Sequence, residues 1–271
     1  MYLCDVHTHS RISPDSEAPL LDMARAAVAG GVDELCVTDH CDLLDMDGNP
    51  VTAFDWPAAL EQYHAVREAV GDRLTLRLGI ELGSAPYDPD TARSILAGAK
   101  EELDFVLGSL HNWIGMEGNG DLCFSNYREN PALCRKVVEH CLDNTWTLVT
   151  RYPDCYDSLA HIVYPLRYLP QDGVKPTLSD YEDQVRAIFK ELARTDHALE
   201  VNVYRGKDLD CWPPLLAWFR ECGGGLVTVG SDAHYPQDVA RGVRQALDML
   251  RAAGFSRVTT FSRRRPELHS L

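Results

Sequence analysis

Short apolar runs alternate with longer helical patterns along the whole chain. The apolar runs are rich in β-branched residues and predict strands at 2–6, 34–38, 74–80, 104–108, 157–160, 198–202, 226–230 and 257–261. Helices are predicted between them, beginning near residue 16 or 22 and at 55 and 130, and spanning 89–102, 179–195, 213–222 and 237–253. Strands that alternate with helices in this way favour a parallel sheet covered by helices, either open or closed into a barrel.

Nothing along the chain marks a boundary between two halves. The sequence contains no internal repeat, no low-complexity tract and no linker rich in Pro, Gly and Ser. Its length of 271 residues is close to that of one α/β barrel, for which about 250 residues is typical. We therefore expect residues 1–271 to form a single α/β domain.

Composition and charge limit which partners and which cellular compartment we expect for this domain. The chain carries 26 Lys and Arg against 41 Asp and Glu, a net charge of −15, which disfavours nucleic acid and anionic membranes as partners. No apolar run approaches the roughly 20 residues of a membrane span, and the first residues lack the layout of a signal peptide. Nine cysteines without a CxxC pair indicate reduced thiols. We expect a cytoplasmic protein whose oligomeric state the sequence leaves open.

Nearly every predicted strand is followed by a side chain that can bind a metal ion. The strand-end candidates, in chain order, are His7, His9, Asp15, His40, Glu81, His111, His161, Asp232 and His234, with Glu200 on the sixth strand. In a parallel barrel the carboxyl ends of all strands share one face, so these residues converge there. His7 and His9 are two apart in an extended segment and point to the same side.

The other four histidines serve as an internal comparison. The triplet Thr-Asp-His occurs at 38–40 and again at 195–197. The first copy follows a strand, whereas the second closes a helix and precedes a strand, which places His197 on the opposite face. His64 and His140 fall inside predicted helices and His269 near the end of the chain. We expect these four to be ordinary packing or surface residues.

Nine candidate ligands are more than one ion can use, since zinc takes about four and manganese or ferrous iron about six. Sharing Glu81 as a bridge would give two or three divalent ions, and a nitrogen and oxygen set without Cys suits Zn, Fe or Mn. Ions about 3.5–4 Å apart can hold a bridging hydroxide and stabilise both oxygens of an in-line displacement at phosphorus. Hydrolysis of a phosphate ester is the chemistry that this pattern favours.

The motifs together resemble the polymerase-and-histidinol-phosphatase (PHP) superfamily. The resemblance rests on DVHTHSRISPD, TDH, GIE, GSLH, the His of DSLAHI and GSDAH, in this order over residues 5–234. GSLHNW, ENP, DSLAHIVYPLRY and LEVN are most similar to stand-alone histidinol-phosphatases. The resemblance implies a distorted (β/α)7 barrel with a trinuclear metal site at the carboxyl ends of the strands, so the eighth predicted strand, 257–261, would lie outside it.

The same resemblance implies roles for the candidate ligands. The first ion would take His7, His9, Glu81 and Asp232, the second Glu81, His111 and His161, and the third Asp15, His40 and His234. A hydroxide bridging the metals, held by the cluster with Glu81, Asp232 and His234, would attack the phosphorus of L-histidinol phosphate and release L-histidinol, a step of histidine biosynthesis. Where many relatives have Asp two residues after His161, this chain has Val163.

Substrate-binding residues follow less directly. Arg167 and Arg205, after the fifth and sixth strands, are candidates to clamp the phosphate, and Arg11 is a weaker one. Asp39 is a candidate to orient a ligand histidine. Residues near the predicted loops that suit the imidazole and ammonium of histidinol are Glu17, Asp42, Asp45, Trp113 and Tyr204.

Three alternatives remain open. The same cluster could hydrolyse a nucleotide, a sugar phosphate or a nucleic-acid end. An amidohydrolase-like barrel is disfavoured because Glu81 stands where a carboxylated Lys would bridge, and a scaffold that uses the ions only for folding is the nonenzymatic alternative. Three ions would give the site a local charge of about +2 despite the net −15, so a small phosphate monoester is favoured over a polyanion.

Overall fold

The computed structural model describes residues 1–116, 118–122, 130–169 and 176–271, so Glu129 of the ENP motif lies outside the described residues. The main sheet consists of β1 (Cys4–Thr8), β2 (Glu34–Val37), β3 (His40–Asp42), β4 (Thr75–Gly83), β5 (Phe105–Ser109), β6 (Ser158–Leu159), β7 (Ala198–Asn202) and β8 (Val227–Gly230). All of its strand pairs are parallel. Because β2 and β3 pair one after the other with β4, they share one of seven positions in the order β1-β2-β4-β5-β6-β7-β8.

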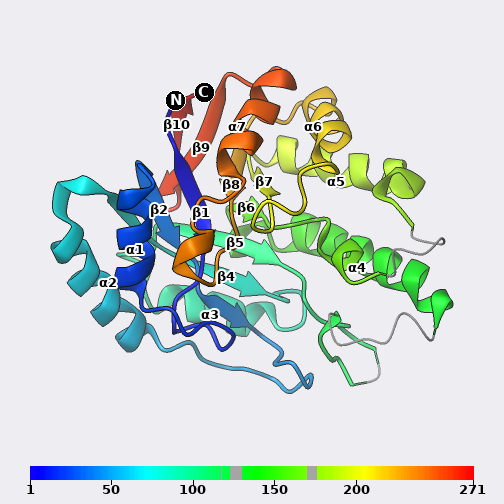
Figure 1. The fold of residues 1–271 in the computed structure, drawn as a ribbon. Helices are drawn as coiled ribbons and strands as arrows, with labels where there is room; N and C mark the ends of the chain where they lie inside the picture. Colours follow the sequence, from blue (N-terminus) through cyan, green and yellow to red (C-terminus); the bar gives the residue numbers. More distant parts are fainter. Residues whose placement is uncertain (117, 123–129, 170–175) are drawn as a thin grey trace.

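The helices surround this sheet, as Figure 1 shows. They are α1 (Leu20–Ala29), α2 (Trp56–Val70), α3 (Pro89–Ala97), α4 (Pro131–Arg151), α5 (Glu182–Arg194), α6 (Trp212–Glu221) and α7 (Val243–Ala252). Strands buried on both faces read as near-continuous apolar runs, which is why the sequence predicted every strand of the main sheet except β3, whose three residues include only one apolar residue. Among the described residues, no helix combines the length and apolar character that crossing a membrane requires.

The first and last strands of the sheet meet, so the barrel is nearly closed. The backbone N–H of Asp232 donates to the carbonyl of His7 at 2.9 Å, and that of His9 donates to Ala233 at 2.9 Å. Below them, the buried carboxylate of Asp5 accepts hydrogen bonds from Ser231 N at 2.8 Å and Ser231 Oγ at 2.6 Å. The predicted distorted (β/α)7 barrel is confirmed.

Helix ends follow the expected chemistry in some places and differ in others. Asp55 caps α2 by accepting from Ala58 N at 3.1 Å, as its position before Pro57 predicts. The helix predicted over 89–102 instead ends at Ala97, where Gly98 packs against Trp56 so closely that a Cβ would lie 2.5 Å from its ring. The helix predicted from 237 begins only at Val243, because Gly242 has the left-handed φ of 87°.

A two-stranded antiparallel hairpin stands outside the barrel. It pairs β9 (Arg257–Ser262), which the sequence predicted, with β10 (Arg265–Ser270), which it did not. β10 is mostly exposed and polar, so it lacks the apolar run of a buried strand. The ring of His269 on β10 stacks on Tyr2 with 3.8 Å between centroids, which brings the two ends of the chain together (Figure 1).

Candidate metal centre

The carboxyl ends of the barrel strands carry the side chains that the sequence singles out as ligands. His7 lies on β1, His9 and Asp15 follow it, His40 begins β3, Glu81 lies on β4, His111 follows β5, His161 follows β6, and Asp232 and His234 follow β8. Parallel strands deliver residues distant in sequence to one face. The structure brings all nine together there.

Glu81 is the centre of this arrangement, and its side chain is fully buried. Its Oε1 lies 2.6 Å from Nε2 of His161 and 3.2 Å from Nε2 of His111. Its Oε2 lies 3.0 Å from Nε2 of His7 and 3.1 Å from Nδ1 of His40. One carboxylate therefore presents a separate oxygen to each of two groups of imidazoles, as a ligand that bridges two ions must.

Two further carboxylates, those of Asp232 and Asp15, also contact imidazoles of the cluster. Oδ1 of Asp232 lies 3.5 Å from Nε2 of His9. Oδ2 of Asp15 lies 2.9 Å from Nε2 of His234 and 3.6 Å from Nε2 of His40. The side chain of Asp15 is 52% exposed, whereas that of Asp232 is 10% exposed, so the cluster runs from the barrel interior to the rim of the site.

Two of these donor atoms make no aligned hydrogen bond, which tests whether the site suits a metal. Nε2 of His9 and Nδ1 of His40 are buried and make no aligned hydrogen bond, although Asp232 Oδ1 lies 3.5 Å from the first and Glu81 Oε2 3.1 Å from the second, an arrangement that a bound metal ion would satisfy. Four overlapping groups hold their donor atoms within 4.8 Å of one another: His9, His40 and His234; His7, Glu81 and His161; His7, His9 and Asp232; His40, Glu81 and His111. This set of nitrogen and oxygen donors fits divalent zinc, iron or manganese.

Carboxylates and imidazoles in the cluster shift one another's pKa values. Burial lowers the pKa of His7, His40 and His111, but the carboxylates of Glu200, Glu81 and Asp42 outweigh it and raise the pKa of all three, so a divalent ion would displace their protons. Burial, together with the neighbouring imidazoles of His234 and His40, holds the pKa of His9 well below its usual value, so its ring is neutral. Burial acts to raise the pKa of Glu81, but the charges of His7 and the other imidazoles around it hold that pKa well below the usual range. A neutral imidazole and an ionised carboxylate are the forms that bind a metal ion.

Two of the candidate ligand histidines, His7 and His111, have a carboxylate behind the ring. Nδ1 of His7 lies 2.6 Å from Oε1 of Glu200, and Nδ1 of His111 lies 2.7 Å from Oδ1 of Asp42. Such carboxylates fix the tautomer and direction of a ligand ring. Asp42, which the sequence put forward for substrate contact, makes this contact and also lines the cavity onto which the cluster opens.

Asp39 reaches the candidate ligand His9 only through the side chain of Ser13. Its Oδ1 accepts from Ser13 Oγ at 2.9 Å, and Ser13 Oγ lies 3.0 Å from Nδ1 of His9. Sequence reasoning did not assign Glu200 or Ser13 this kind of role. The sequence does contain a sign of the role of Glu200. An acidic residue within the apolar strand Ala198–Asn202 is expected to be buried, and a buried carboxylate needs a partner.

Comparison with known proteins decides the family. The sequence profile of the PHP domain matches residues 5–203, which is most of the chain. This chain belongs to the PHP domain family. A histidinol-phosphatase from Lactococcus lactis is 26% identical over 263 residues, covering 95% of this PHP protein and 94% of the relative. A probable histidinol-phosphatase from Clostridium acetobutylicum is 29% identical over 252 residues, covering 90% and 91% of the two chains.

A solved structure extends the likeness to the whole fold. The crystal structure of histidinol phosphate phosphatase from Lactococcus lactis, complexed with zinc, L-histidinol and phosphate, covers 98% of both chains with a TM-score of 0.81 and 24% identity. The PHP profile ends before β8, whereas this structural match includes it. The seven-position barrel of this PHP protein is therefore a fold that a solved structure shares throughout.

The cluster opens into a cavity of about 340 Å³. Besides candidate ligand residues, the cavity is lined by four tyrosines, two arginines and four other residues, namely Tyr164, Tyr168, Tyr204, Tyr235, Arg167, Arg205, Pro14, Asp42, Met46 and Asp121. Arg11 instead lines a separate groove between α1 and α2, together with Leu20 and Gln62. Of the three arginines that the sequence put forward, the structure places two at the cavity of this PHP protein and one in that groove.

The four remaining histidines lie away from the cluster. Nε2 of His197 lies 2.8 Å from the carbonyl oxygen of Pro153, and Nε2 of His64 lies 2.9 Å from Glu102. His140 sits within α4, and His269 bonds to Thr260 at 2.8 Å.

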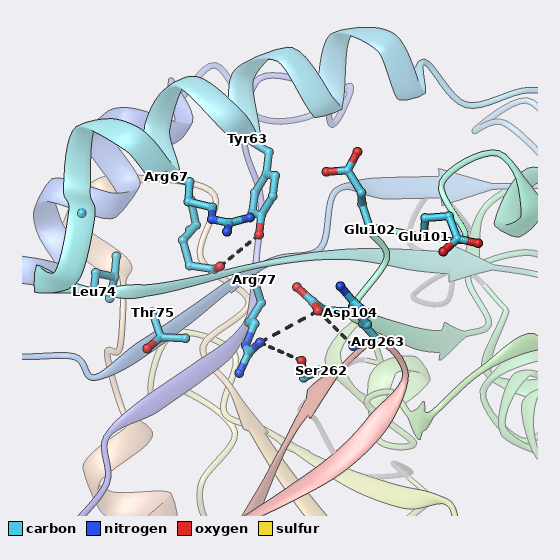
Figure 2. Close-up of a pocket in the computed structure, with 12 residues that line it drawn as sticks. Tyr63, Arg67, Leu74, Thr75, Arg77, Glu101, Glu102, Asp104, Ser262 and Arg263 are labelled. Atoms are coloured by element: carbon cyan, nitrogen blue, oxygen red, sulfur yellow. Dashed lines mark hydrogen bonds and ion pairs between the residues drawn. The ribbon is translucent and has the colours of Figure 1, made fainter.

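Another cavity, of about 450 Å³, is polar and lies at the amino end of β4 (Figure 2). Arg77 is central to it and reaches Ser262 at 2.9 Å and Asp104 at 4.0 Å. The same guanidinium contacts Glu267 at 2.8 Å and Glu34 at 3.3 Å. Although Glu34 and Glu267 form a possible donor group with His269, Arg77 already supplies their positive charge.

Glu200→Gln tests the orienting role of Glu200. Its Oε2 accepts from the backbone N–H of His161 at 2.9 Å while Oε1 faces His7, so a glutamine amide must turn an NH₂ group toward one donor. We expect zinc affinity to fall by about 10- to 100-fold, measured by competition with a chelator of known affinity. Glu102→Gln, which alters an exposed Glu–His pair, is the matched control. Unchanged affinity in Glu200→Gln would contradict this role.

Proposed function

We propose that this protein is a metal-dependent histidinol-phosphatase that hydrolyses L-histidinol phosphate to L-histidinol and phosphate. The observation that carries the proposal is the cluster of six imidazoles and three carboxylates around Glu81, which faces a cavity containing arginine. The relatives named above are a histidinol-phosphatase and a probable histidinol-phosphatase, and the solved neighbour is complexed with zinc, L-histidinol and phosphate. These likenesses support the choice of this substrate among phosphate monoesters.

We assign three ion positions to the cluster. His7, His9, Glu81 and Asp232 would hold one ion; Glu81, His111 and His161 a second; Asp15, His40 and His234 a third. The separate directions of Glu81 Oε1 and Oε2 support the first two positions, and the 2.9 Å contact between Asp15 and His234 supports the third. Zinc is the first metal to test because the neighbouring structure contains it.

Bound divalent ions would activate water as a nucleophile and neutralise phosphate charge. Arginine side chains of the protein would bind the phosphate and hold a candidate metal ligand in position. Arg205 lines the cavity and is available to the phosphate, whereas Arg167 holds Asp232 in place at 3.1 Å. In the overall reaction a water oxygen replaces the ester oxygen on phosphorus, and the histidinol oxygen leaves with a proton.

We also infer that residues 1–271 act as one metallohydrolase domain. The outer hairpin is tied to the barrel by ion pairs at two points. Arg264 contacts Asp157 at 3.1 Å, and Glu267 contacts Arg77 of β4 at 2.8 Å. Removal of the hairpin should therefore destabilise the barrel rather than release an independent unit.

The experiment that tests the substrate is a phosphate-release screen on zinc-loaded protein. L-histidinol phosphate is compared with nucleotides and sugar phosphates by kcat/KM. We expect a preference of at least about 100-fold for L-histidinol phosphate, because a site whose polar groups pair with one ligand discriminates strongly against ligands that leave those groups unpaired. Equal kcat/KM values across the panel would refute the substrate while leaving phosphomonoester hydrolysis in place. No hydrolysis of any of them would refute both.

A further inference from the structure

The side chain of Tyr204 is in contact with both arginines of the site cavity. The guanidinium carbon of Arg167 lies 4.2 Å from the centre of the Tyr204 ring, and that of Arg205 lies 4.3 Å from it. Contacts of this length between a guanidinium and an aromatic face are attractive. Nζ of Lys207 lies 5.2 Å from the same ring centre, so a single ring contacts three cationic side chains, of which the two arginines line the cavity.

The backbone around Tyr204 has an unusual conformation. Three consecutive residues have left-handed φ values: 42° at Tyr204, 56° at Arg205 and 76° at Gly206. Only the third is glycine, so the first two are strained, and strain of this kind is kept where the surrounding structure fixes it at a functional site. The turn directs Tyr204 and Arg205 to the cavity that both line.

Contacts on several sides fix this turn. Tyr204 N donates to Asn202 Oδ1 at 2.9 Å, and Arg205 N donates to the carbonyl oxygen of Ser231 at 2.8 Å. Gly206 packs against Gly242, where an added Cβ would lie 2.8 Å from the Gly206 Cα. The segment is therefore built as a rigid support rather than as a loose loop.

The two arginines differ in how many of their guanidinium nitrogens already bond to the protein. Arg167 has a buried side chain whose three nitrogens bond to Asp208 at 2.6 Å, Asn202 at 2.7 Å and Asp232 at 3.1 Å. Arg205 lines the cavity, and its buried Nε has no hydrogen-bond partner. Arg167 is thus occupied by the protein, and Arg205 is the guanidinium left to face a ligand.

We propose that Tyr204 is a positioning residue whose ring holds the guanidinium of Arg205 in place to receive the phosphate group of the substrate. A flexible arginine loses side-chain freedom when it binds an anion, and a guanidinium already stacked on a rigid ring loses less. The stacked Arg167, anchored by two carboxylates, fixes the ring in turn. This inference rests on the proposed phosphatase function and adds a residue that the substrate does not need to touch.

Tyr204→Asn is the decisive variant, because asparagine tolerates a left-handed φ and so removes the ring without straining the turn. Affinity for inorganic phosphate is measured by calorimetry on zinc-loaded protein, with zinc content and unfolding midpoint recorded for each variant. We expect the phosphate Kd to rise about 10-fold in Tyr204→Asn and to stay near the wild-type value in Tyr204→Phe. KM for the phosphate monoester should rise in parallel, with kcat changed little.

Two controls decide between stacking and a general structural effect. Tyr152→Asn removes a ring that also lies near an arginine, 5.8 Å from the guanidinium carbon of Arg93, but outside the cavity, and it should leave phosphate affinity unchanged. In an Arg205→Asn background, Tyr204→Asn should cause no further loss, because Tyr204 acts through Arg205.

Three results would overturn the inference: wild-type phosphate affinity in Tyr204→Asn, a Tyr204→Phe as weak as Tyr204→Asn, or an undiminished loss in the Arg205→Asn background. Phosphate affinity is measured without turnover. If the wild-type protein binds phosphate but does not hydrolyse L-histidinol phosphate, the proposed function fails while the role of Tyr204 is still decided.

Discussion

Replacing Glu81 with glutamine is expected to lower kcat/KM by more than about 100-fold, since residues that only orient metal ligands are already worth about 10- to 100-fold. Glu81 is fully buried and has imidazoles against both of its oxygens. A glutamine presents one oxygen and one NH₂ group, so it cannot face both groups of imidazoles as a ligand. Activity and metal content per chain are measured on the same preparation, and both should fall.

The control for Glu81→Gln is Glu34→Gln. Glu34 is also a buried glutamate, on the neighbouring strand β2, but its partners are Tyr2 and Arg77 at the other end of the barrel. We expect Glu34→Gln to lower stability while retaining metal content and kcat/KM. If Glu81→Gln kept its full metal content and activity, the assignment of Glu81 as the bridging ligand would be wrong.

Removal of metal by a chelator is expected to abolish activity and to lower the unfolding temperature. Ligands that bind only the folded state stabilise it by about 4 kcal/mol at a thousandfold excess over Kd, and this stabilisation is lost when they are removed. We expect this loss of stability because Nε2 of His9 is buried without an aligned hydrogen bond and a bound metal ion would satisfy it. Adding zinc back should restore both quantities.

Treating Glu81→Gln with the same chelator shows whether the loss of stability comes from emptying this cluster or from a general effect of the chelator on the protein. If the cluster is the metal site, the unfolding temperature of this variant should respond much less to chelator than that of the wild type. A wild-type protein that keeps its activity after exhaustive chelation would contradict a metal-dependent mechanism. Calorimetric unfolding scans and a phosphate-release assay give the two readouts.

The convergence of the nine candidate ligands was predictable because parallel strands place their carboxyl ends on one face. The contrast between His40 and His197 illustrates the reason: both follow Thr-Asp, but only His40 comes after a strand of the barrel and lies against Glu81, at 3.1 Å. His197 precedes β7 and bonds to Pro153 instead. Strand direction, which the sequence reveals, was sufficient to separate them.

Other features depend on three-dimensional contacts that spacing does not encode. Glu81 and Glu200 are both buried acidic residues on strands, yet Glu200 bonds to Nδ1 of His7 at 2.6 Å, behind the ring, while Glu81 faces its Nε2. Arg11 follows β1 as the ligands do, but its loop leads to the groove beside α1. The turn at Tyr204 was not predicted because two of its left-handed residues are not glycine.

The meeting of β1 with the residues after β8 has a consequence for the order in which this protein matures. A ribosome delivers β1 first and β8 last among the strands of the main sheet, and domains fold as their residues emerge. His7 and His9 therefore exist long before Asp232 and Ala233, to which their backbones bond. A chain that ends before β8 carries five of the six imidazoles but lacks Asp232 and His234, so the proposed first and third ion positions are complete only after β8 and the residues behind it have been made.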